Sequence, residues 1–311
     1  MYGEILYNNV VSINDGTAYQ VLESKREADI LLAMLDDLAE AIADFDGIIA
    51  GGAVTSVFTN KEVNDFDLYF PDAKRASQFV AAVHTGDFGY HTFRNITPKS
   101  LMFVGRGQDT KCQLIFYKFH PTVESIFNDF DFTLNMGAFD VKAKKFILHP
   151  DFLRHNSQRT VQINTKTAYP IISVLRTQKY KERGYHVSKP QLVRLLLAIT
   201  QLQISSWKEM EDQLGGMYGY NVEDIFPKEE PYSLEKALEI IDTLHPKILS
   251  ELPGTTLDLT DIQKATVDIF PPEFQNVLGK YSWREADGKV LAINYAYPDA
   301  EPKPVNKDLD F

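Results

Sequence analysis

A glycine pair followed at a fixed distance by two aspartates is the feature that most constrains the fold of this chain. Gly51 and Gly52 close a short apolar run at 48–50, and Asp65 and Asp67 follow after a spacer of twelve residues. On a β-strand, residues two apart point to the same face of the sheet. The two carboxylates are therefore predicted to lie side by side, where they can hold a hard divalent cation.

The tetrapeptide that contains these aspartates occurs twice in the chain. Asn64-Asp65-Phe66-Asp67 is repeated as Asn128-Asp129-Phe130-Asp131, but a glycine pair precedes only the first copy. The first copy is therefore predicted to be the metal-binding pair. In the second copy, Asp129 is expected to lie on the protein surface.

Composition indicates a soluble globular protein of one large or two modest domains. The chain has 311 residues, of which 44% are hydrophobic and 24% are charged, so a sizeable core is expected. No apolar run reaches the roughly 18 residues that a membrane span needs, and the N-terminus lacks a signal-peptide pattern. Cys112 is the single cysteine, which argues against disulfides and a zinc cluster. We expect no membrane association and a reducing, cytoplasmic location.

The charge of the chain is unevenly distributed. The net charge is -11, yet residues 142–194 hold twelve Lys and Arg against two acids, which gives this basic band +10 and the remainder -21. Such a band can follow a polyanion or hold a triphosphate. The alternative is an ordinary solvated helical surface, and the sequence leaves both open.

Hydrophobic periodicity predicts an α+β head over residues 1–150, with a mixed sheet flanked by helices. Helices are predicted at 24–45 and 73–83, and strands at 48–50, 65–70, 100–105 and 111–118. Residues 151–286 are predicted to form a helical, partly basic region, and residues 287–311 an extended tail. The helices expected in that region lie at 170–183, 189–202, 205–214, 233–252 (kinked at Pro246) and 259–269.

The first motif predicts a site for a nucleoside triphosphate. Gly51 and Gly52 lack a Cβ, so their backbone can approach a phosphate closely, and a helix is expected to begin directly after them. Asp65 and Asp67 would hold Mg²⁺ that bridges the triphosphate. Metal ions in such a site activate an attacking hydroxyl and stabilise the departing pyrophosphate.

This arrangement resembles the DNA polymerase β-type nucleotidyltransferase superfamily. Within it, the chain is most similar to the head of the class II group, the CCA-adding enzymes and bacterial poly(A) polymerases, and to phage-like members. A second signature of that group, Arg-Arg-Asp-Phe-Thr-Ile-Asn-Ala, is matched by residues 129–136. A third, Leu-Arg-Met-Leu-Arg-Ala-Val-Arg-Phe, is matched by residues 172–180. The resemblance covers residues 46–185.

The resemblance implies roles for residues in all three signatures. It implies catalytic roles for Asp65, Asp67 and Asp131, and nucleotide binding by Gly51, Gly52, Asn135, Arg176 and Lys179. For Asp131 the alternative is a helix N-cap, and for Asn135 it is a polar position on a helix face. Arg176 and Lys179 lie three apart on one helix face, where they can grip phosphates.

Four positions depart from the family pattern. Asp129 and Phe130 stand where the family carries paired arginines, and Ser173 replaces the first arginine of the third signature. Gln113 occupies a strand where this superfamily often supplies a third carboxylate, and an amide is a poorer partner for Mg²⁺.

The resemblance implies a Mg²⁺-dependent transfer of NMP from an NTP, with ATP the expected donor, to an acceptor hydroxyl. RNA, such as a tRNA-like 3′ end, is the favoured acceptor, and a protein or small molecule is the alternative. A non-catalytic nucleotide- or RNA-binding protein on the same fold is the rival function, followed by an interaction protein with a relic head. The base preference and the oligomeric state stay open.

Overall fold

A single mixed sheet carries the glycine pair and the first aspartate pair. The computed structural model describes residues 5–6, 10–12, 18–85, 91–96, 99–105, 111–215, 226–227, 229–243, 281–286 and 289–294. Over these residues the sheet strands are β1 (Ile5–Leu6), β2 (Val10–Ser12), β3 (Ala18–Leu22), β4 (Ile48–Ala50), β5 (Asp65–Tyr69), β6 (His91–Ile96), β7 (Ser100–Gly105), β8 (Lys111–Ile115), β9 (Gly137–Asp140) and β10 (Lys145–Leu148).

The strand order places the candidate site near the middle of the sheet. Across the described residues the order is β1-β2-β3-β10-β9-β4-β5-β8-β7-β6. Every neighbouring pair is antiparallel except β5 and β8, which run parallel. β4, with the glycines after it, and β5, with the aspartates, are therefore direct neighbours.

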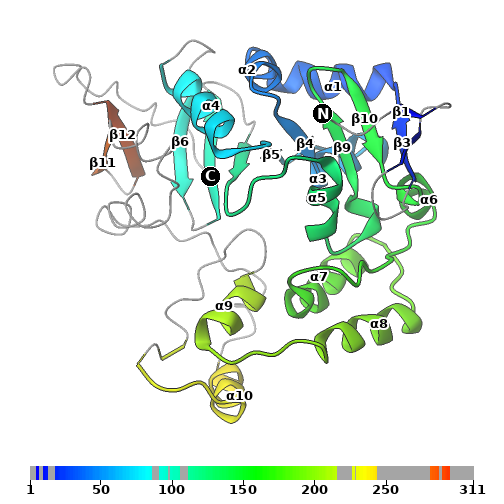
Figure 1. Ribbon diagram of the computed structural model, residues 1–311, viewed down its shortest axis with the longest axis vertical. Coiled ribbons are helices and arrows are strands. Elements are labelled where there is room, and N and C mark those ends of the chain that lie inside the picture. Colours follow the sequence, from blue (N-terminus) through cyan, green and yellow to red (C-terminus); the bar gives the residue numbers. More distant parts are fainter. Residues whose placement is uncertain are drawn as a thin grey trace.

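Helices cover both faces of this sheet, which confirms the predicted α+β class (Figure 1). They are α1 (Lys25–Leu35), α2 (Leu38–Asp44), α3 (Gly52–Phe58), α4 (Ala73–Thr85) and α5 (Val123–Asp129). The single helix predicted at 24–45 is in fact two, because the backbone at Asp36 takes a positive φ of 49° that interrupts the helical hydrogen bonds.

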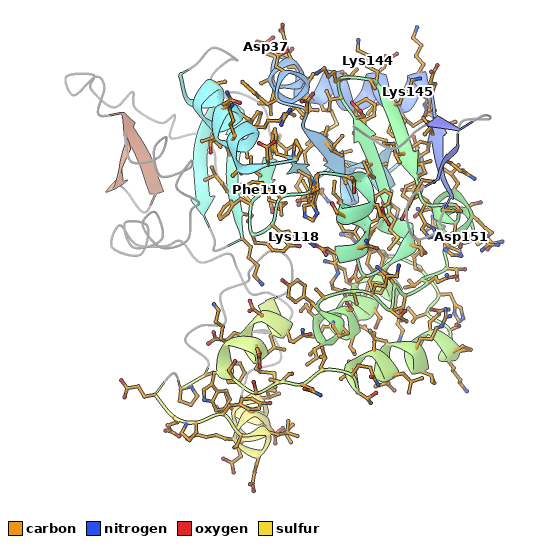
Figure 2. All side chains as sticks on the ribbon, in the orientation of Figure 1. Asp37, Lys118, Phe119, Lys144, Lys145 and Asp151 are labelled. Atoms are coloured by element: carbon orange, nitrogen blue, oxygen red, sulfur yellow. The ribbon has the colours of Figure 1, made fainter. Side chains whose placement is uncertain are left out.

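The side chains of β5 point alternately into two cores, one on each face of the sheet. This alternation decides which face Asp65 and Asp67 share. Phe66 and Leu68 pack into the core beneath α1, α2, α3 and α4. Tyr69 packs into the opposite core, with Phe127 of α5. Since side chains alternate along a strand, Asp65 and Asp67 share the face of Tyr69. Side chains fill the layers on either side of the sheet (Figure 2).

The predicted strands at 48–50, 65–70, 100–105 and 111–118 correspond to β4, β5, β7 and β8. By contrast, the sequence did not predict β1, β2, β3, β6, β9 or β10. The polar position on a helix face considered for Asn135 is also not found. Asn135 lies in a 3₁₀ turn, η1 (Thr133–Asn135), before β9 begins. β9 and β10 are four residues each and almost wholly buried, so they lack the alternation that signals a strand.

Five described helices follow the sheet: α6 (Phe152–Ser157), α7 (Pro170–Glu182), α8 (Lys189–Ile199), α9 (Trp207–Gly215) and α10 (Leu234–Thr243). Four of them match predicted helices, and α6 is the additional one. α7 is anchored to the head, because Tyr180 packs with Phe132 and Leu134 in one buried cluster. A separate cluster around Trp207 joins α9 to α10.

The C-terminal part of the chain is described only in part. β11 (Tyr281–Ala286) and β12 (Lys289–Asn294) form an antiparallel pair, so the domain boundary predicted after residue 286 falls between two paired strands. The predicted helix at 259–269, the kink at Pro246 and the end of the tail lie outside the described residues. No described helix is both long and apolar enough to cross a membrane.

Gly137 offers a test of the packing between sheet and helices. A Cβ at Gly137 would lie 2.7 Å from Cε2 of Phe152 and 2.8 Å from Cγ1 of Val54, both fully buried. We expect Gly137→Ala to lower the free energy of unfolding by about 1–3 kcal/mol, as overpacking does. Chemical denaturation would measure this. Gly52→Ala is the matched control, because nothing lies within 4 Å of its added Cβ; equal losses in both variants would contradict the packing.

Candidate functional site

The glycine pair forms a tight turn between β4 and α3. Gly51 has φ +86°, a conformation that side chains with a Cβ rarely adopt, and its N–H donates to the carbonyl of Gly137 at 2.9 Å. A Cβ at Gly51 would lie 3.8 Å from Oδ2 of Asp67 and 3.5 Å from the ring of Phe130. The space beside Gly52 is open. The turn thus brings bare backbone against one carboxylate and leaves room beside it.

Asp65 and Asp67 lie on the same face of β5, as their spacing predicts. Asp67 is opposite Ala50 on β4, directly before the glycines, and is only 7% exposed. Asp65, the first residue of β5 and two positions before Asp67, is half-buried. The two carboxylates therefore line the mouth of the turn, with Asp67 the deeper one.

Gln113 stands beside Asp67 on the neighbouring strand. The parallel register of β5 and β8 pairs Asp67 with Gln113 and Asp65 with Lys111. Between them, Cys112 points into the opposite core, where burial first, then Asp65 and Asp67, raise the pKa of its thiol. The thiol is therefore not a nucleophile for this site, and the polar side chain paired with Asp67 is a neutral amide.

The residues present fit Mg²⁺ only if substrate phosphates and water supply the remaining ligands. Among the described residues, no three Asp, Glu, His or Cys side chains are grouped so that they could hold a metal. Mg²⁺, however, is commonly held by one or two carboxylates together with substrate phosphates and water. Asp65 and Asp67 can supply the protein's part of such a set, and the open space at Gly52 can admit the phosphates.

Asp131 connects the head to the helical region through an ion pair. Its Oδ2 lies 2.7 Å from Nε of Arg176 on α7, and its side chain is 10% exposed. Burial raises the pKa of Asp131, and the nearby Arg176 charge opposes that rise. The N-cap residue of η1 is Phe132, without a side-chain cap. Asp131 is thus an ion-pair partner of Arg176 and not the N-cap of η1, and its catalytic role stays a prediction.

Asn135 belongs to the same connection between head and α7. The hydroxyl of Tyr180 donates to Oδ1 of Asn135 at 2.8 Å, and both side chains are buried. The second and third signatures of the sequence therefore meet in space, through Asp131 with Arg176 and Asn135 with Tyr180. Ser173, where the family carries an arginine, is fully buried and donates to the carbonyl of Tyr169, so an arginine has no room there.

Some cations of the basic band are paired with acids at the surface. Lys142, Lys145 and Arg154 form ion pairs with nearby acids, at 2.7, 2.9 and 2.6 Å. Lys144 and Lys145 lie at the end of the molecule away from α7 (Figure 2). For these residues the solvated-surface interpretation holds.

Four other cations of the band, with Lys61 from outside it, form what we call the cation track: Arg176, Lys179, Arg183, Arg159 and Lys61. Arg176, Lys179 and Arg183 follow one face of α7 and its end at helical spacing. Partial burial, then Arg183 and Arg176, lower the pKa of Lys179, and Asp65 and Asp131 oppose this. The track therefore starts within electrostatic reach of the aspartates.

The far end of the cation track is held by backbone contacts. Nη1 of Arg159 donates to the carbonyl of Arg183 at 3.4 Å, and Nζ of Lys61 lies 5.6 Å from the centre of the Tyr185 ring. Partial burial, then the charges of Arg159 and Arg183, lower the pKa of Lys61. Three chain segments thus converge with like charges, an arrangement that an anion would stabilise.

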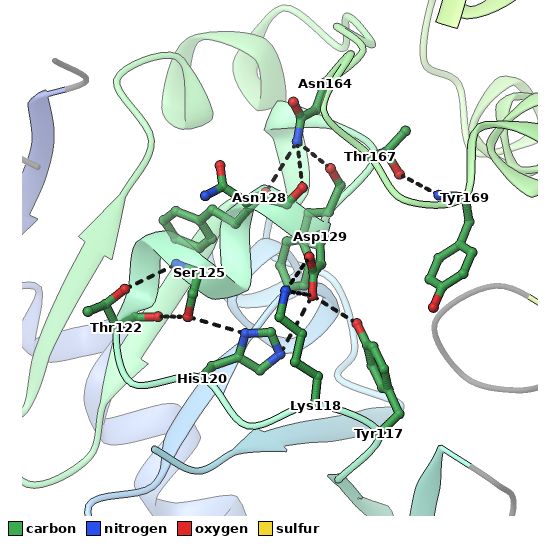
Figure 3. Close-up of polar contacts among 12 residues, drawn as sticks. Tyr117, Lys118, His120, Thr122, Ser125, Asn128, Asp129, Asn164, Thr167 and Tyr169 are labelled. Atoms are coloured by element: carbon green, nitrogen blue, oxygen red, sulfur yellow. Dashed lines mark hydrogen bonds and ion pairs between the residues drawn. The ribbon is translucent and has the colours of Figure 1, made fainter. Parts of the chain in front are cut away.

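The second tetrapeptide serves a different purpose from the first. Asp129, expected on the surface, has a side chain only 11% exposed. It accepts hydrogen bonds from the Tyr117 hydroxyl at 3.0 Å and from Lys118 Nζ at 2.9 Å (Figure 3). The expectation was wrong because α5 ends at Asp129, so that its carboxylate lies against Tyr117 and Lys118 in the segment after β8.

His120 lies beneath this cluster. Its Nδ1 is 3.3 Å from the Ser125 hydroxyl and its Nε2 is 3.8 Å from Asp129, and the ring is 4% exposed (Figure 3). Burial lowers the pKa of His120 to about 4, against the attraction of Asp129. Ser125 donates its own hydroxyl proton to the carbonyl of Thr122 at 2.7 Å. His120 is therefore a neutral, hydrogen-bonded part of the scaffold that closes the loop before α5.

Comparison with known proteins gives both a family match and a fold. Residues 23–159 match the family model described as Gabija anti-defense 2 family protein. A protein named Gabija anti-defense 2, from Bacillus phage SPbetaL7, is 42% identical over 241 residues, which are 75% of this chain and 59% of that relative. The chain thus spans less than two thirds of the relative's length.

Solved structures of CCA-adding enzymes share the fold. An apo form I structure has a TM-score of 0.50 at 12% identity, covering 83% of this chain and 69% of that one. A complex with CTP has a TM-score of 0.50 at 13% identity, covering 85% and 71%. The fold is therefore nucleotidyltransferase-like and resembles the CCA-adding enzyme head, as the sequence motifs predicted.

The buried His120 predicts an acid-sensitive stability. The histidine of the unfolded chain takes up a proton near pH 6.5, whereas the folded one stays neutral down to about pH 4. The unfolded state binds more protons between these values, so stability falls as the pH falls, by up to about 1.4 kcal/mol per pH unit. We expect His120→Asn to reduce that slope, measured by urea denaturation. The exposed His186→Asn is the control, and an unchanged slope in His120→Asn would contradict the assignment.

Proposed function

We propose that the chain is a Mg²⁺-dependent nucleotidyltransferase that moves NMP from an NTP, with ATP the expected donor, to an acceptor hydroxyl. The observation that carries the proposal is the placement of Asp67 against the bare backbone of Gly51, with open space at Gly52 and Asp65 on the same face. A triphosphate in that space would meet backbone N–H groups on one side and carboxylates on the other.

Each residue of the site has a role under this proposal. Asp65 and Asp67 would hold Mg²⁺, which supplies charge neutralisation on the leaving pyrophosphate and a lower pKa of the attacking hydroxyl. Gly51 and Gly52 would receive the phosphates. Lys179, whose charge reaches Asp65, would bind the triphosphate from the side of α7. Arg176 would be held in position by Asp131, and Asn135 by Tyr180.

The cation track supports RNA as the acceptor. Lys61, Arg159 and Arg183 lie beyond Lys179, so a strand whose 3′ end reaches the aspartates could follow them with its phosphates. The acidity of the rest of the chain would confine the strand to this surface. A protein or small-molecule hydroxyl would need none of these cations.

The relative suggests the biological setting. A protein named Gabija anti-defense 2, from a Bacillus phage, is 42% identical over 241 residues. We propose that this chain also counters a host defence, and that nucleotidyl transfer is the means. The acceptor would then be an RNA that the defence or its regulation uses.

A non-catalytic nucleotide- or RNA-binding protein is the second candidate. Gln113 beside Asp67 favours it, because an amide leaves the site with fewer negative ligands for Mg²⁺. The buried pair of Asp131 with Arg176 favours it too, since a paired arginine is less available to phosphates. Under this candidate, NTP binds but no acceptor becomes labelled.

Replacing the aspartates distinguishes the two candidates. We expect Asp65→Asn/Asp67→Asn to reduce Mg²⁺-dependent transfer of labelled NMP to total RNA by at least about 100-fold, because the metal loses its protein ligands. The exposed Asp29→Asn on α1 is the matched control and should retain wild-type transfer. Equal transfer in wild type and double variant would overturn the catalytic proposal, and NTP binding without transfer would favour the second candidate.

The acceptor is tested by salt dependence. We expect Lys61→Gln/Arg159→Gln/Arg183→Gln to weaken RNA binding and to reduce the slope of log affinity against log salt by about 2, the effect of three lost phosphate contacts to a single strand. Filter binding across a salt series would measure it. Lys25→Gln/Lys74→Gln/Lys144→Gln removes the same charge from exposed positions away from α7. An equal change in both triple variants would argue for a general charge effect without a track.

A further inference from the structure

Helix α8 exposes large aliphatic side chains. Val193, Leu196 and Leu197 are 53%, 58% and 60% exposed, although the same helix buries Leu195 in the cluster that joins α7 to the head. Positions three and four apart lie on one face of a helix, so these side chains form a continuous apolar stripe. Single exposed leucines are ordinary, but contiguous apolar patches mark interaction sites.

Helix α10 exposes a second stripe of the same kind. Leu234 and Leu238 are 60% and 54% exposed, while Ala237 is fully buried in the cluster around Trp207. The two stripes lie on helices at the end of the molecule away from α1 and α2 (Figure 1). Neither belongs to the candidate nucleotide site or to the cation track.

The charges beside the two stripes are opposite in sign. α8 carries Lys189 and Arg194, both exposed, and no acidic residue. On α10, exposed acids follow the apolar positions at the same helical spacing: Glu235, Glu239 and Asp242. The one lysine of α10, Lys236, is paired with Glu230. Pairing α8 with another α8 would oppose cations, and pairing α10 with another α10 would oppose carboxylates. Only α8 against α10 matches apolar with apolar and cation with acid.

We propose that the chain forms a two-fold symmetric dimer in which α8 of each protomer packs against α10 of its partner. Two-fold symmetry makes every contact occur twice, so both stripes of both protomers are covered. One helix pair alone would give a small interface, whereas a pair of pairs approaches the roughly 1,200 Å² of a weak but specific complex. Arg194 would lie at the rim opposite the acids of α10, where it sets the pairing and contributes less to affinity.

Sedimentation over a concentration series tests this dimer in the full chain. We expect a species of twice the 35.4 kDa chain mass, and a dissociation constant at least about tenfold weaker in Leu196→Asp, because a charge would enter the apolar contact. Leu153→Asp is the matched control: Leu153 is 38% exposed on α6, outside the stripes. Wild type that stays monomeric up to about 100 μM, or equal effects of both substitutions, would overturn the dimer.

A charge swap tests the pairing of unlike helices. Arg194→Glu should weaken the dimer, and adding Glu239→Arg to the same chain should restore it, since each α8 faces the partner's α10. Arg194→Glu that strengthens association would indicate contact of α8 with α8 and would overturn the arrangement. Self-association that grows beyond two copies would also overturn it, because the unlike contacts would then propagate instead of closing. RNA binding by these variants should equal that of wild type, which separates this outcome from failure of the proposed function.

Discussion

The ion pair of the buried Asp131 with the partly exposed Arg176 is the interaction on which the arrangement of the candidate site depends. Removing Arg176 would leave the buried charge of Asp131 uncompensated, which is costly even where the pair itself adds little net stability. The pair, together with the hydrogen bond of Tyr180 to Asn135, fixes α7 against the head. That docking determines which face of α7 lies towards the aspartates of β5, and so where the cation track begins.

The two copies of the tetrapeptide show how surroundings assign a role to identical residues. In the first copy, β5 is paired on both sides, so Asp65 and Asp67 face the open turn at Gly51. In the second copy, α5 ends at Asp129 and the chain becomes extended at Phe130. Asp129 therefore turns back to Tyr117 and Lys118, and Asp131 turns towards α7. One copy faces the open turn at Gly51, and the other ties three chain segments together.

The sequence predicted those features that short-range patterns determine. The order of β4, the glycine turn, α3 and β5 follows from local periodicity and spacing, and so does the shared face of Asp65 and Asp67. The pairing of Asp131 with Arg176 depends on residues 45 positions apart in the chain, which no local pattern encodes. The break at Asp36 also escaped prediction, because the apolar spacing continues across it while the backbone does not.

Gln113 limits the number of carboxylates that the site can offer to Mg²⁺. With two carboxylates and an amide, the protein supplies few of the six oxygens that Mg²⁺ prefers. A cation would then stay only when triphosphate oxygens complete its shell, so metal and nucleotide would bind as a unit under the proposed function. Under the same proposal, the lower negative charge would also reduce repulsion of the triphosphate, which matters because Arg176 is engaged by Asp131. The neutral side chain of Gln113 would thus compensate in part for the loss of the positive charge of Arg176, which is neutralised by Asp131 where it holds α7 in place.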